Sequence, residues 1–200
     1  RGKVVFDASL FGDVVIAKSV ETALYNFAVV IDDALMRITH VIRGEDHLSN
    51  TPKQILFLKA LGFPEPRYVH LPLLLNPDRS KLSKRYAEVS LLRYRDDGYL
   101  REAVLNFLAL LGWHPEDAQE VFTARELVAA FELKRAQKGG AIFNEEKLEW
   151  LNAQHLKRLT DEEFSEQLRN FLEPQKIFSH FFKDTILLEK VVSLERERVK

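Results

Sequence analysis

The sequence contains no cysteine, and this absence excludes several kinds of chemistry from its 200 residues. Disulfide bonds, thiolate zinc sites and cysteine nucleophiles all need a thiol, so none of them can form within this chain. Long apolar runs are also missing, since no stretch approaches the ~20 residues that a helix needs to cross a bilayer. Together these absences predict a soluble protein of the cytoplasm that has no membrane partner.

An excess of charge of either sign is absent as well. The chain carries 29 Lys and Arg residues against 30 Asp and Glu residues, which gives a net charge of -1. This balance excludes a globally basic surface for nucleic acid, although it leaves room for a local basic patch. With 46% hydrophobic and 30% charged residues, the composition is that of a globular protein of one or two domains.

Both ends of the sequence differ from those of a finished protein. The chain starts at Arg1 rather than at a methionine, and residues 195–200 continue a helical pattern without a terminator. We therefore expect these residues to be a piece of a longer protein.

The first 80 residues have the pattern of an α/β fold. Short β-branched runs at 4–6 and 14–17 predict a hairpin, and the mainly apolar stretch 24–36 favours a buried helix. Strands are then expected at 38–42 and 68–71, with a helix between them. The order strand, helix, strand is typical of parallel sheets.

Helix signals mark the start of that connecting helix and most of the chain after residue 76. Thr51, Pro52 and Gln54 predict a capping box at its start, and Gly62 predicts its end. Further helix starts are predicted at Thr123, Asn144 and Thr160, and an apolar helix at 103–111. The fold class is thus α/β followed by all-α.

A basic pentapeptide follows the loop at 76–80. Lys81-Leu82-Ser83-Lys84-Arg85 places three cations and a hydroxyl together, a combination that suits phosphate oxygens. Residues 79–101 contain seven Lys or Arg and three Asp or Glu, a local charge of +4. This is where a nucleotide or nucleic acid would be attracted, although an isolated basic pentapeptide is more often only a solvated loop.

Three side chains of the α/β half are further candidates. Arg43 and Asp46 lie where a predicted strand meets a loop, the usual ligand crevice of open α/β sheets, so Arg43 could bind a carboxylate and Asp46 a ribose or adenine. Tyr25 could hydrogen-bond a substrate, but such a tyrosine is more often only packed. An ion-pair loop remains the alternative for Arg43 and Asp46. No metal site is predicted, because the spacing of the neighbouring histidines and aspartates fits no ligand pattern.

Five motifs taken in order closely resemble the bacterial glutamyl-tRNA synthetases, which are class I aminoacyl-tRNA synthetases. They are Tyr25 to Asp33, Thr39 to His47, Asn50 to Pro52, His70 to Leu74, and Lys81 to Arg85, which looks like the KMSKS loop of that class. The resemblance continues through 99–113 and 139–152 and thins after about residue 160.

The resemblance implies a role for each matching residue. It implies that the glutamate site contains Tyr25, Asn26, Phe27, Ala28, Val29 and Arg43, with Arg43 on the side-chain carboxylate. It implies ATP contacts from Asp46, Leu74, Lys81, Leu82, Ser83, Lys84 and Arg85, with Lys81 and Lys84 as the catalytic residues that neutralise the phosphates. ATP would enter as a substrate with Mg²⁺, and no metal would be bound by the protein itself.

The implied function is that of a glutamate-tRNA ligase, which activates L-glutamate with ATP and transfers it to the 3′ end of tRNA-Glu. Residues 1–80 would be the second half of a Rossmann-like catalytic domain, 81–120 the KMSKS-type loop and stem-contact region, and 121–200 the first helices of an α-helical anticodon-binding domain. The full-length protein would be a monomer.

The sequence also departs from that family. The His-x-Gly-His motif of class I synthetases occurs nowhere in the 200 residues, so we expect the isolated chain to form no adenylate. Two alternatives stay open, namely a non-catalytic tRNA-binding module derived from a class I synthetase and a relative of glutaminyl-tRNA synthetase.

Overall fold

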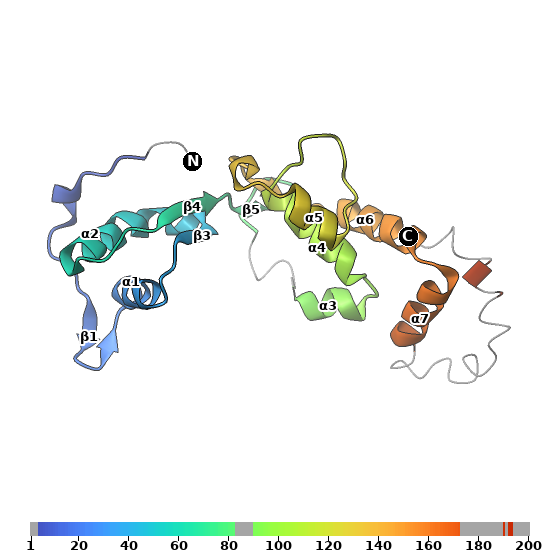
Figure 1. Cartoon of the computed structure of the whole chain (residues 1–200), viewed down its shortest axis with the longest axis horizontal. Helices are drawn as coiled ribbons and strands as arrows, with labels where there is room; N and C mark the ends of the chain where they lie inside the picture. The colour runs from blue at the N-terminus through green and yellow to red at the C-terminus, as the bar shows by residue number, and fades with distance from the viewer. Residues whose placement is uncertain (1–3, 83–89, 173–189, 191, 194–200) are drawn as a thin grey trace. The chain divides into compact units, whose positions relative to one another are not determined.

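The structure is a computed structural model that describes residues 4–82, 90–172, 190 and 192–193 (Figure 1). The chain forms two compact units, one made chiefly of residues 1–73 and the other chiefly of residues 74–137 and 141–200. Each unit is built around its own packed elements and is described by itself. The expected domain boundaries near residues 80 and 120 stay predictions.

The first unit has the α/β character expected from the sequence. Strands β3 (His40–Gly44) and β4 (Arg67–Leu71) pair in parallel, with Arg43 opposite His70. Helix α2 (Thr51–Leu61) connects them and packs against α1 (Tyr25–Leu35). Gly62 ends α2 in the left-handed conformation with φ of 71°, as the glycine predicted.

Two local predictions for this unit were wrong. Residues 4–6 form no strand; instead, the Asp7 carboxylate accepts the Ser9 N–H at 3.0 Å and caps the short helix η1 (Ala8–Phe11). The hairpin forms later, between β1 (Ala17–Ser19) and β2 (Thr22–Ala23). The capping box at Thr51 is also absent, because the short helix η2 (Glu45–Asn50) runs directly into α2 and the Gln54 side chain is used elsewhere.

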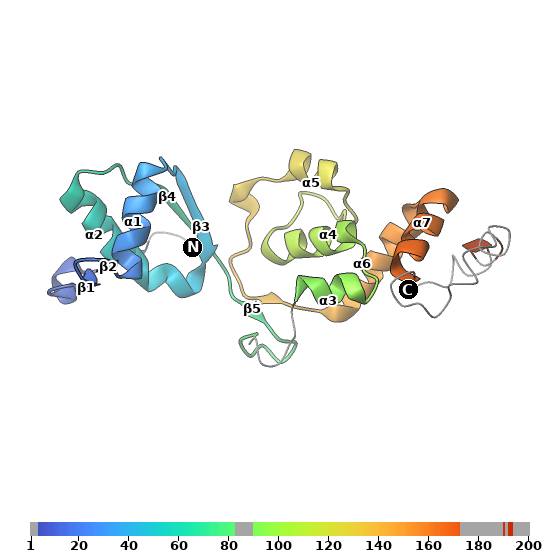
Figure 2. The same cartoon turned by 90° about the horizontal axis from the view of Figure 1, so that it is seen from below.

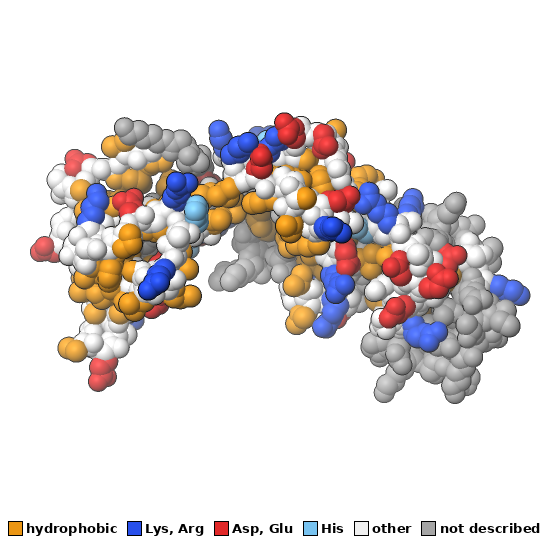
Figure 3. Space-filling model, in the orientation of Figure 1, with side chains coloured by type: hydrophobic (Ala, Val, Ile, Leu, Met, Phe, Trp, Pro, Cys, Tyr) orange, Lys and Arg blue, Asp and Glu red, His pale blue; other side chains and the backbone are white. Residues whose placement is uncertain are grey.

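Several large apolar side chains of the first unit are exposed. Leu35 and Met36 are each more than 70% exposed, and Ile42 on β3 is 50% exposed. Figure 3 shows apolar side chains gathered on the face of this unit over α1. Burial of large apolar side chains in this unit is concentrated at Val30 of α1 and Leu58 of α2, where the two helices pack together.

The second unit is mainly helical. It contains α3 (Leu91–Asp96), α4 (Arg101–Gly112), α5 (Ala124–Ala130), η3 (Leu133–Arg135), α6 (Glu145–Arg158) and α7 (Asp161–Leu172), with the short parallel pair β5 (Leu74–Leu75) and β6 (Ala141–Ile142). Figure 2 shows α4 between α3 and α5. Its core joins α4 to α6 and includes Phe107 and Phe143, whose rings meet edge to face at 5.0 Å.

The helix starts predicted for this unit are confirmed. Thr123 and Glu126 form a reciprocal capping box, Asn144 accepts the Lys147 N–H, and Thr160 exchanges the same pair of bonds with Glu163. Within the described residues, no helix combines the length and the apolar character needed to span a bilayer.

Hydrogen bonds from two buried asparagine side chains connect elements of the second unit. The side chain of Asn106 is fully buried; its Oδ1 accepts the Phe122 N–H at 2.8 Å, and its Nδ2 donates to the Glu120 carbonyl at 3.0 Å. The same Oδ1 lies 3.1 Å from His155 Nε2. Asn152 accepts the Leu100 N–H at 2.9 Å and so secures the start of α4. The bonds of Asn106 fix the loop that follows α4 to α4 itself and, through His155, to α6.

Candidate functional site

The side chain of Arg43 is fixed at the end of strand β3 by residues from three elements. Its Nε donates to His70 Nε2 on β4 at 3.3 Å, and its Nη2 donates to Thr51 Oγ1 on α2 at 2.8 Å. Nη2 also reaches the His47 carbonyl at 3.4 Å, and the guanidinium lies 5.3 Å from the centre of the Tyr68 ring. Among the described residues Nη1 has no hydrogen-bond partner, so its two hydrogens are not used within this network.

The local sequence explains why these groups converge. The parallel register places Arg43 beside His70 although 27 residues separate them, and η2 turns the chain so that α2 begins close to the strand end. A Cβ at Gly44 would meet the carboxylate of Asp46, which is the far end of an exposed side chain and can move aside. Gly44 has extended backbone angles, φ of -65° and ψ of 149°, that other residues adopt as well.

His70 is held in its neutral form by this surrounding. Burial lowers the pKa of His70 below its usual value, and the positive charge of Arg43 lowers the pKa further. Arg43 Nε can only donate, so His70 Nε2 must accept, and the network assigns the proton of the neutral ring to Nδ1. The ring is thus an acceptor beside the guanidinium rather than a second cation.

Tyr25 lies at the first position of α1 and contacts the same network. Its Oη is 3.5 Å from His47 Nδ1, the two rings are 5.7 Å apart, and the side chain is 52% exposed. Asn50 Nδ2 lies 3.2 Å from the same His47 nitrogen. His47 therefore links the tyrosine to the residues that hold Arg43, while about half of the Tyr25 surface remains exposed.

The residues after Tyr25 make contacts within the helix pair. Asn26 Oδ1 accepts from Gln54 Nε2 at 3.0 Å, and the Phe27 ring meets Phe57 edge to face at 5.8 Å. Ala28 and Val29 are partly buried. Asn26 and Phe27 thus pack the start of α1 against α2, and the expected role of all four residues in a glutamate pocket stays a prediction.

The acidic groups near this network are spread out. Asp46 Oδ2 is 3.9 Å from His47 Nε2, and both side chains remain partly exposed. Burial raises the pKa of Asp33, an effect that the positive charge of Arg43 opposes. Over the part of the chain that the structure describes, no group of three or more His, Asp or Glu residues could hold a metal ion.

The remaining candidates belong to the second unit. Leu74 of β5 is 38% exposed, and its carbonyl accepts the Leu82 N–H at 3.0 Å, while Lys81 bridges to Leu75. Leu82 packs against the core, so its side chain is partly buried, and Lys81 is exposed. Ser83, Lys84 and Arg85 lie outside the described residues.

The sequence interpretation missed the residues that hold Arg43. His47, Thr51 and His70 were part of recognised motifs without a role of their own, and Thr51 was expected to cap a helix. The available signal was the strand register: two parallel strands of similar length bring their carboxyl ends together, which makes 43 and 70 neighbours.

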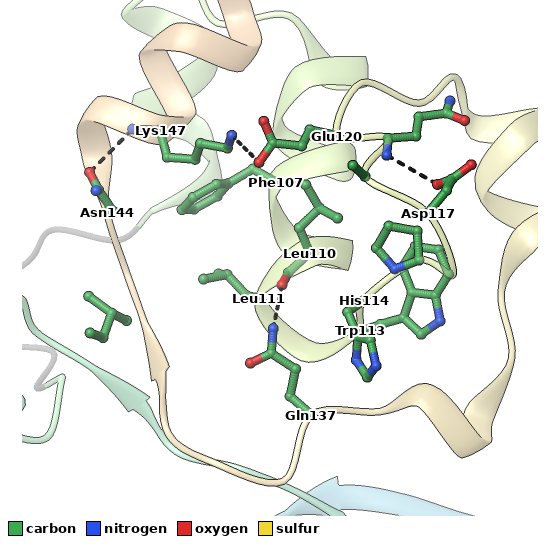
Figure 4. A pocket seen from close by; sticks show the side chains of 14 residues that line it. Phe107, Leu110, Leu111, Trp113, His114, Asp117, Glu120, Gln137, Asn144 and Lys147 are labelled. Carbon is green, nitrogen blue, oxygen red and sulfur yellow. Dashed lines mark hydrogen bonds and ion pairs between the residues drawn. The ribbon is translucent and has the colours of Figure 1, made fainter.

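The second unit also contains a cavity of about 620 Å³ beside α4 (Figure 4). Leu110, Leu111 and Trp113 provide much of its apolar wall, and Glu120 pairs with Lys147 at 2.7 Å on its rim. The Leu110 carbonyl accepts from Gln137 Nε2 at 3.0 Å. The Asp117 carboxylate, which also lines the cavity, accepts the Gln119 N–H at 3.1 Å.

Comparison with known proteins places this geometry in context. A family model described as the catalytic domain of class I tRNA synthetases (E and Q) matches residues 1–150. The glutamate-tRNA ligase of Aquifex aeolicus is 52% identical over 160 residues, which are 80% of this chain and 34% of that protein. That of Desulforudis audaxviator is 47% identical over an alignment of 201 positions, which covers 100% of this chain and 40% of that protein.

A solved structure is similar as well. The crystal structure of a glutamate tRNA ligase from Elizabethkingia meningosepticum in complex with its amino acid has a TM-score of 0.83 and 32% sequence identity, over 95% of this chain and 41% of that one. The chain thus spans about two fifths or less of the length of these relatives.

Proposed function

Because the chain belongs to the catalytic-domain family of class I tRNA synthetases for glutamate and glutamine, we propose that it is part of a glutamate-tRNA ligase. The named relatives that cover the whole chain are glutamate-tRNA ligases. The proposal covers the activity of the full-length protein, its substrates L-glutamate, ATP and tRNA-Glu, and its action as a cytoplasmic monomer.

The observation that carries the choice of glutamate is the fixed guanidinium of Arg43. It lies at the carboxyl end of a parallel strand, is held by Thr51 and His70, and keeps two Nη1 hydrogens for a ligand. Ligands of open α/β sheets bind at this edge. A permanent cation attracts the side-chain carboxylate of glutamate, whereas the neutral amide of glutamine gains no such charge interaction.

The reaction needs positioning and charge stabilisation rather than a protein nucleophile. The glutamate α-carboxylate attacks the α-phosphorus of ATP, pyrophosphate leaves, and the glutamyl group is then transferred to the terminal ribose of the tRNA. Lys81 and Lys84 neutralise the charge that develops on the phosphates. Asp46, Leu74, Leu82, Ser83 and Arg85 contribute to the ATP site, and Mg²⁺ enters with ATP.

The basic stretch at 79–101 is part of the same proposal. Its local charge of +4 suits the phosphate backbone of a tRNA acceptor stem. In this assignment residues 1–80 are the second half of the catalytic domain, 81–120 the KMSKS-type loop and stem-contact region, and 121–200 the first helices of the anticodon-binding domain.

The test measures ATP-pyrophosphate exchange by the full-length protein, with glutamate and glutamine as separate substrates. We expect exchange with glutamate and a KM for glutamate raised about tenfold to about a hundredfold by Arg43→Ala, since hydrogen bonds between charged groups contribute about 1.5–3 kcal/mol. Arg67→Ala is the matched control, because Arg67 is exposed at the start of β4.

Three results would contradict the proposal. Exchange that depends on glutamine rather than glutamate would indicate a glutaminyl-tRNA synthetase relative. Salt-dependent binding of tRNA without any exchange would indicate a non-catalytic tRNA-binding module. A normal glutamate saturation curve for Arg43→Ala would remove Arg43 from the amino-acid site.

A further inference from the structure

His70 lies on strand β4 and contacts the guanidinium of Arg43. We propose that it is a positioning residue, which orients Arg43 for the amino-acid substrate. In its neutral form it accepts from Arg43 Nε and so orients the guanidinium for the carboxylate, and protonation of its Nε2 removes that hydrogen bond. The inference rests on the proposed function, because it takes the glutamate side chain as the ligand of Arg43.

The first step of the argument is the pair of bonds at one nitrogen. His70 Nε2 lies 3.3 Å from Arg43 Nε and 3.0 Å from Thr51 Oγ1. The arginine can only donate, so this nitrogen must carry a lone pair. It orients the guanidinium directly through Nε and indirectly through Thr51, whose Oγ1 accepts from Arg43 Nη2 at 2.8 Å.

The second step is the choice open to the Thr51 hydroxyl. Because Oγ1 accepts from Arg43, its single hydrogen is free to go either to His70 Nε2 or to the His47 carbonyl at 3.3 Å. The shorter of the two contacts is the one to His70. Neutral His70 therefore accepts from both Arg43 Nε and the Thr51 hydroxyl. Nη1 is then the nitrogen of the guanidinium that is left for a ligand.

Protonation reverses the role of the ring. A proton on Nε2 would place a donor opposite the Arg43 donor and would add a second positive charge beside the guanidinium. The Thr51 hydrogen would turn to the His47 carbonyl. Arg43 would then lose its hydrogen bond to β4, and its guanidinium would be oriented only by the Nη2 bonds to Thr51 and His47 and by the Tyr68 ring.

The charged and titratable groups around His70 agree with a neutral ring. Burial and Arg43 lower the pKa of His70, and His47 on η2 acts in the same direction, whereas Glu45 on η2 opposes them. Tyr68 on β4 stacks on the ring with centroids 6.4 Å apart. The ring is therefore neutral at neutral pH and becomes charged only in acid.

The experiment compares two substitutions of His70 in the full-length protein by ATP-pyrophosphate exchange, from about pH 7.5 to about pH 5.5. Gln places an acceptor oxygen near the position of Nε2 and does not titrate in this range, whereas Leu removes the acceptor. His40→Gln is the matched control, because His40 is exposed at the start of β3.

We expect His70→Leu to raise the KM for glutamate about tenfold at neutral pH while the KM for ATP stays within about twofold. We expect His70→Gln to keep a KM for glutamate near that of the wild type at neutral pH. We also expect this variant to lose most of the rise in KM that the wild type and His40→Gln show in acid.

Three results would overturn the inference. The first is an acid limb for His70→Gln that matches the wild type, and the second is a ¹⁵N spectrum that places the proton of neutral His70 on Nε2. Equal rises in both KM values for His70→Leu would indicate a merely structural role and would also refute it. Absence of glutamate-dependent exchange in the wild type would refute the proposed function instead, while the ¹⁵N spectrum would still decide which nitrogen accepts.

Discussion

Replacement of Asn106 by leucine should destabilise the second unit more than any surface change on the same helix. The two side chains have similar size, so the substitution leaves little cavity and acts mainly through lost hydrogen bonds. Asn106 is fully buried, and three groups depend on it: the Phe122 N–H, the Glu120 carbonyl and His155 Nε2. All three would lose their partner at once.

The magnitude follows from the cost of leaving a buried polar group without a partner. Each such group costs about 1–3 kcal/mol, so the three of them predict a loss of about 3–9 kcal/mol in the free energy of unfolding. The loop before α5 should respond most, because two of the three groups belong to it. Asn106→Leu is therefore expected to expose the Phe122 amide even under conditions in which the unit stays folded.

Urea unfolding and amide hydrogen exchange measure the two parts of this prediction. The denaturation midpoint should fall, and the Phe122 amide should exchange orders of magnitude faster than in the wild type. Leu108→Ala is the matched control, since Leu108 lies on the same helix and is 49% exposed. An unchanged Phe122 exchange rate together with a midpoint shift no larger than that of the control would refute the reasoning.

Two further predictions concern the same unit. Burial and the positive charge of Arg158 lower the pKa of His155, so the unfolded chain binds a proton at this histidine more tightly than the folded chain does. The contribution of His155 to the free energy of unfolding should therefore be full above about pH 6.5 and fall as the pH drops below that value. Urea titrations at several pH values should show that His155→Gln removes this part of the loss. Gly98 has φ of 86°, and an added Cβ would lie 3.0 Å from the Phe171 ring, so Gly98→Ala should lower the free energy of unfolding by about 1–2 kcal/mol. Gly62→Ala is the control for backbone strain alone, because Gly62 has φ of 71° and open space around it. Equal losses for the two variants would exclude a contribution from the contact with Phe171.

Much of the fold was predictable because its signals are local. A capping box such as Thr123 with Glu126 needs only four neighbouring residues, and the glycine that ends α2 needs only its own backbone freedom. The parallel strand pair was also predictable, since the order strand, helix, strand leaves few arrangements. These features do not depend on distant contacts.

The failures arose where a distant residue competes for a side chain. Thr51 and Gln54 fit a capping box by spacing, but Thr51 bonds Arg43 and His70, and Gln54 bonds Asn26 on another helix. The hairpin expected from residue 4 failed because Asp7 caps its own turn. Local patterns describe what a side chain could do, and tertiary partners decide what it does.

The candidate site follows the same division. Arg43 was identified from its place after a strand, but the residues that fix its direction come from β4 and α2 and carry no local signal. The spacing of 27 residues between Arg43 and His70 becomes meaningful only once the strand register is known. The roles of Ser83, Lys84 and Arg85 stay predictions, because these residues lie outside the described part of the chain.

The amide pair between Gln54 and Asn26 has a consequence for engineering. It joins α2 to α1, and the first residue of each helix, Thr51 and Tyr25, belongs to the site. If either helix is replaced by that of a relative in order to change the amino-acid preference, the other helix will be misplaced unless the partner of the amide bond is replaced as well. The two helices are thus a single cassette for recombination, and chimaeras that exchange them together should retain activity where single exchanges lose it.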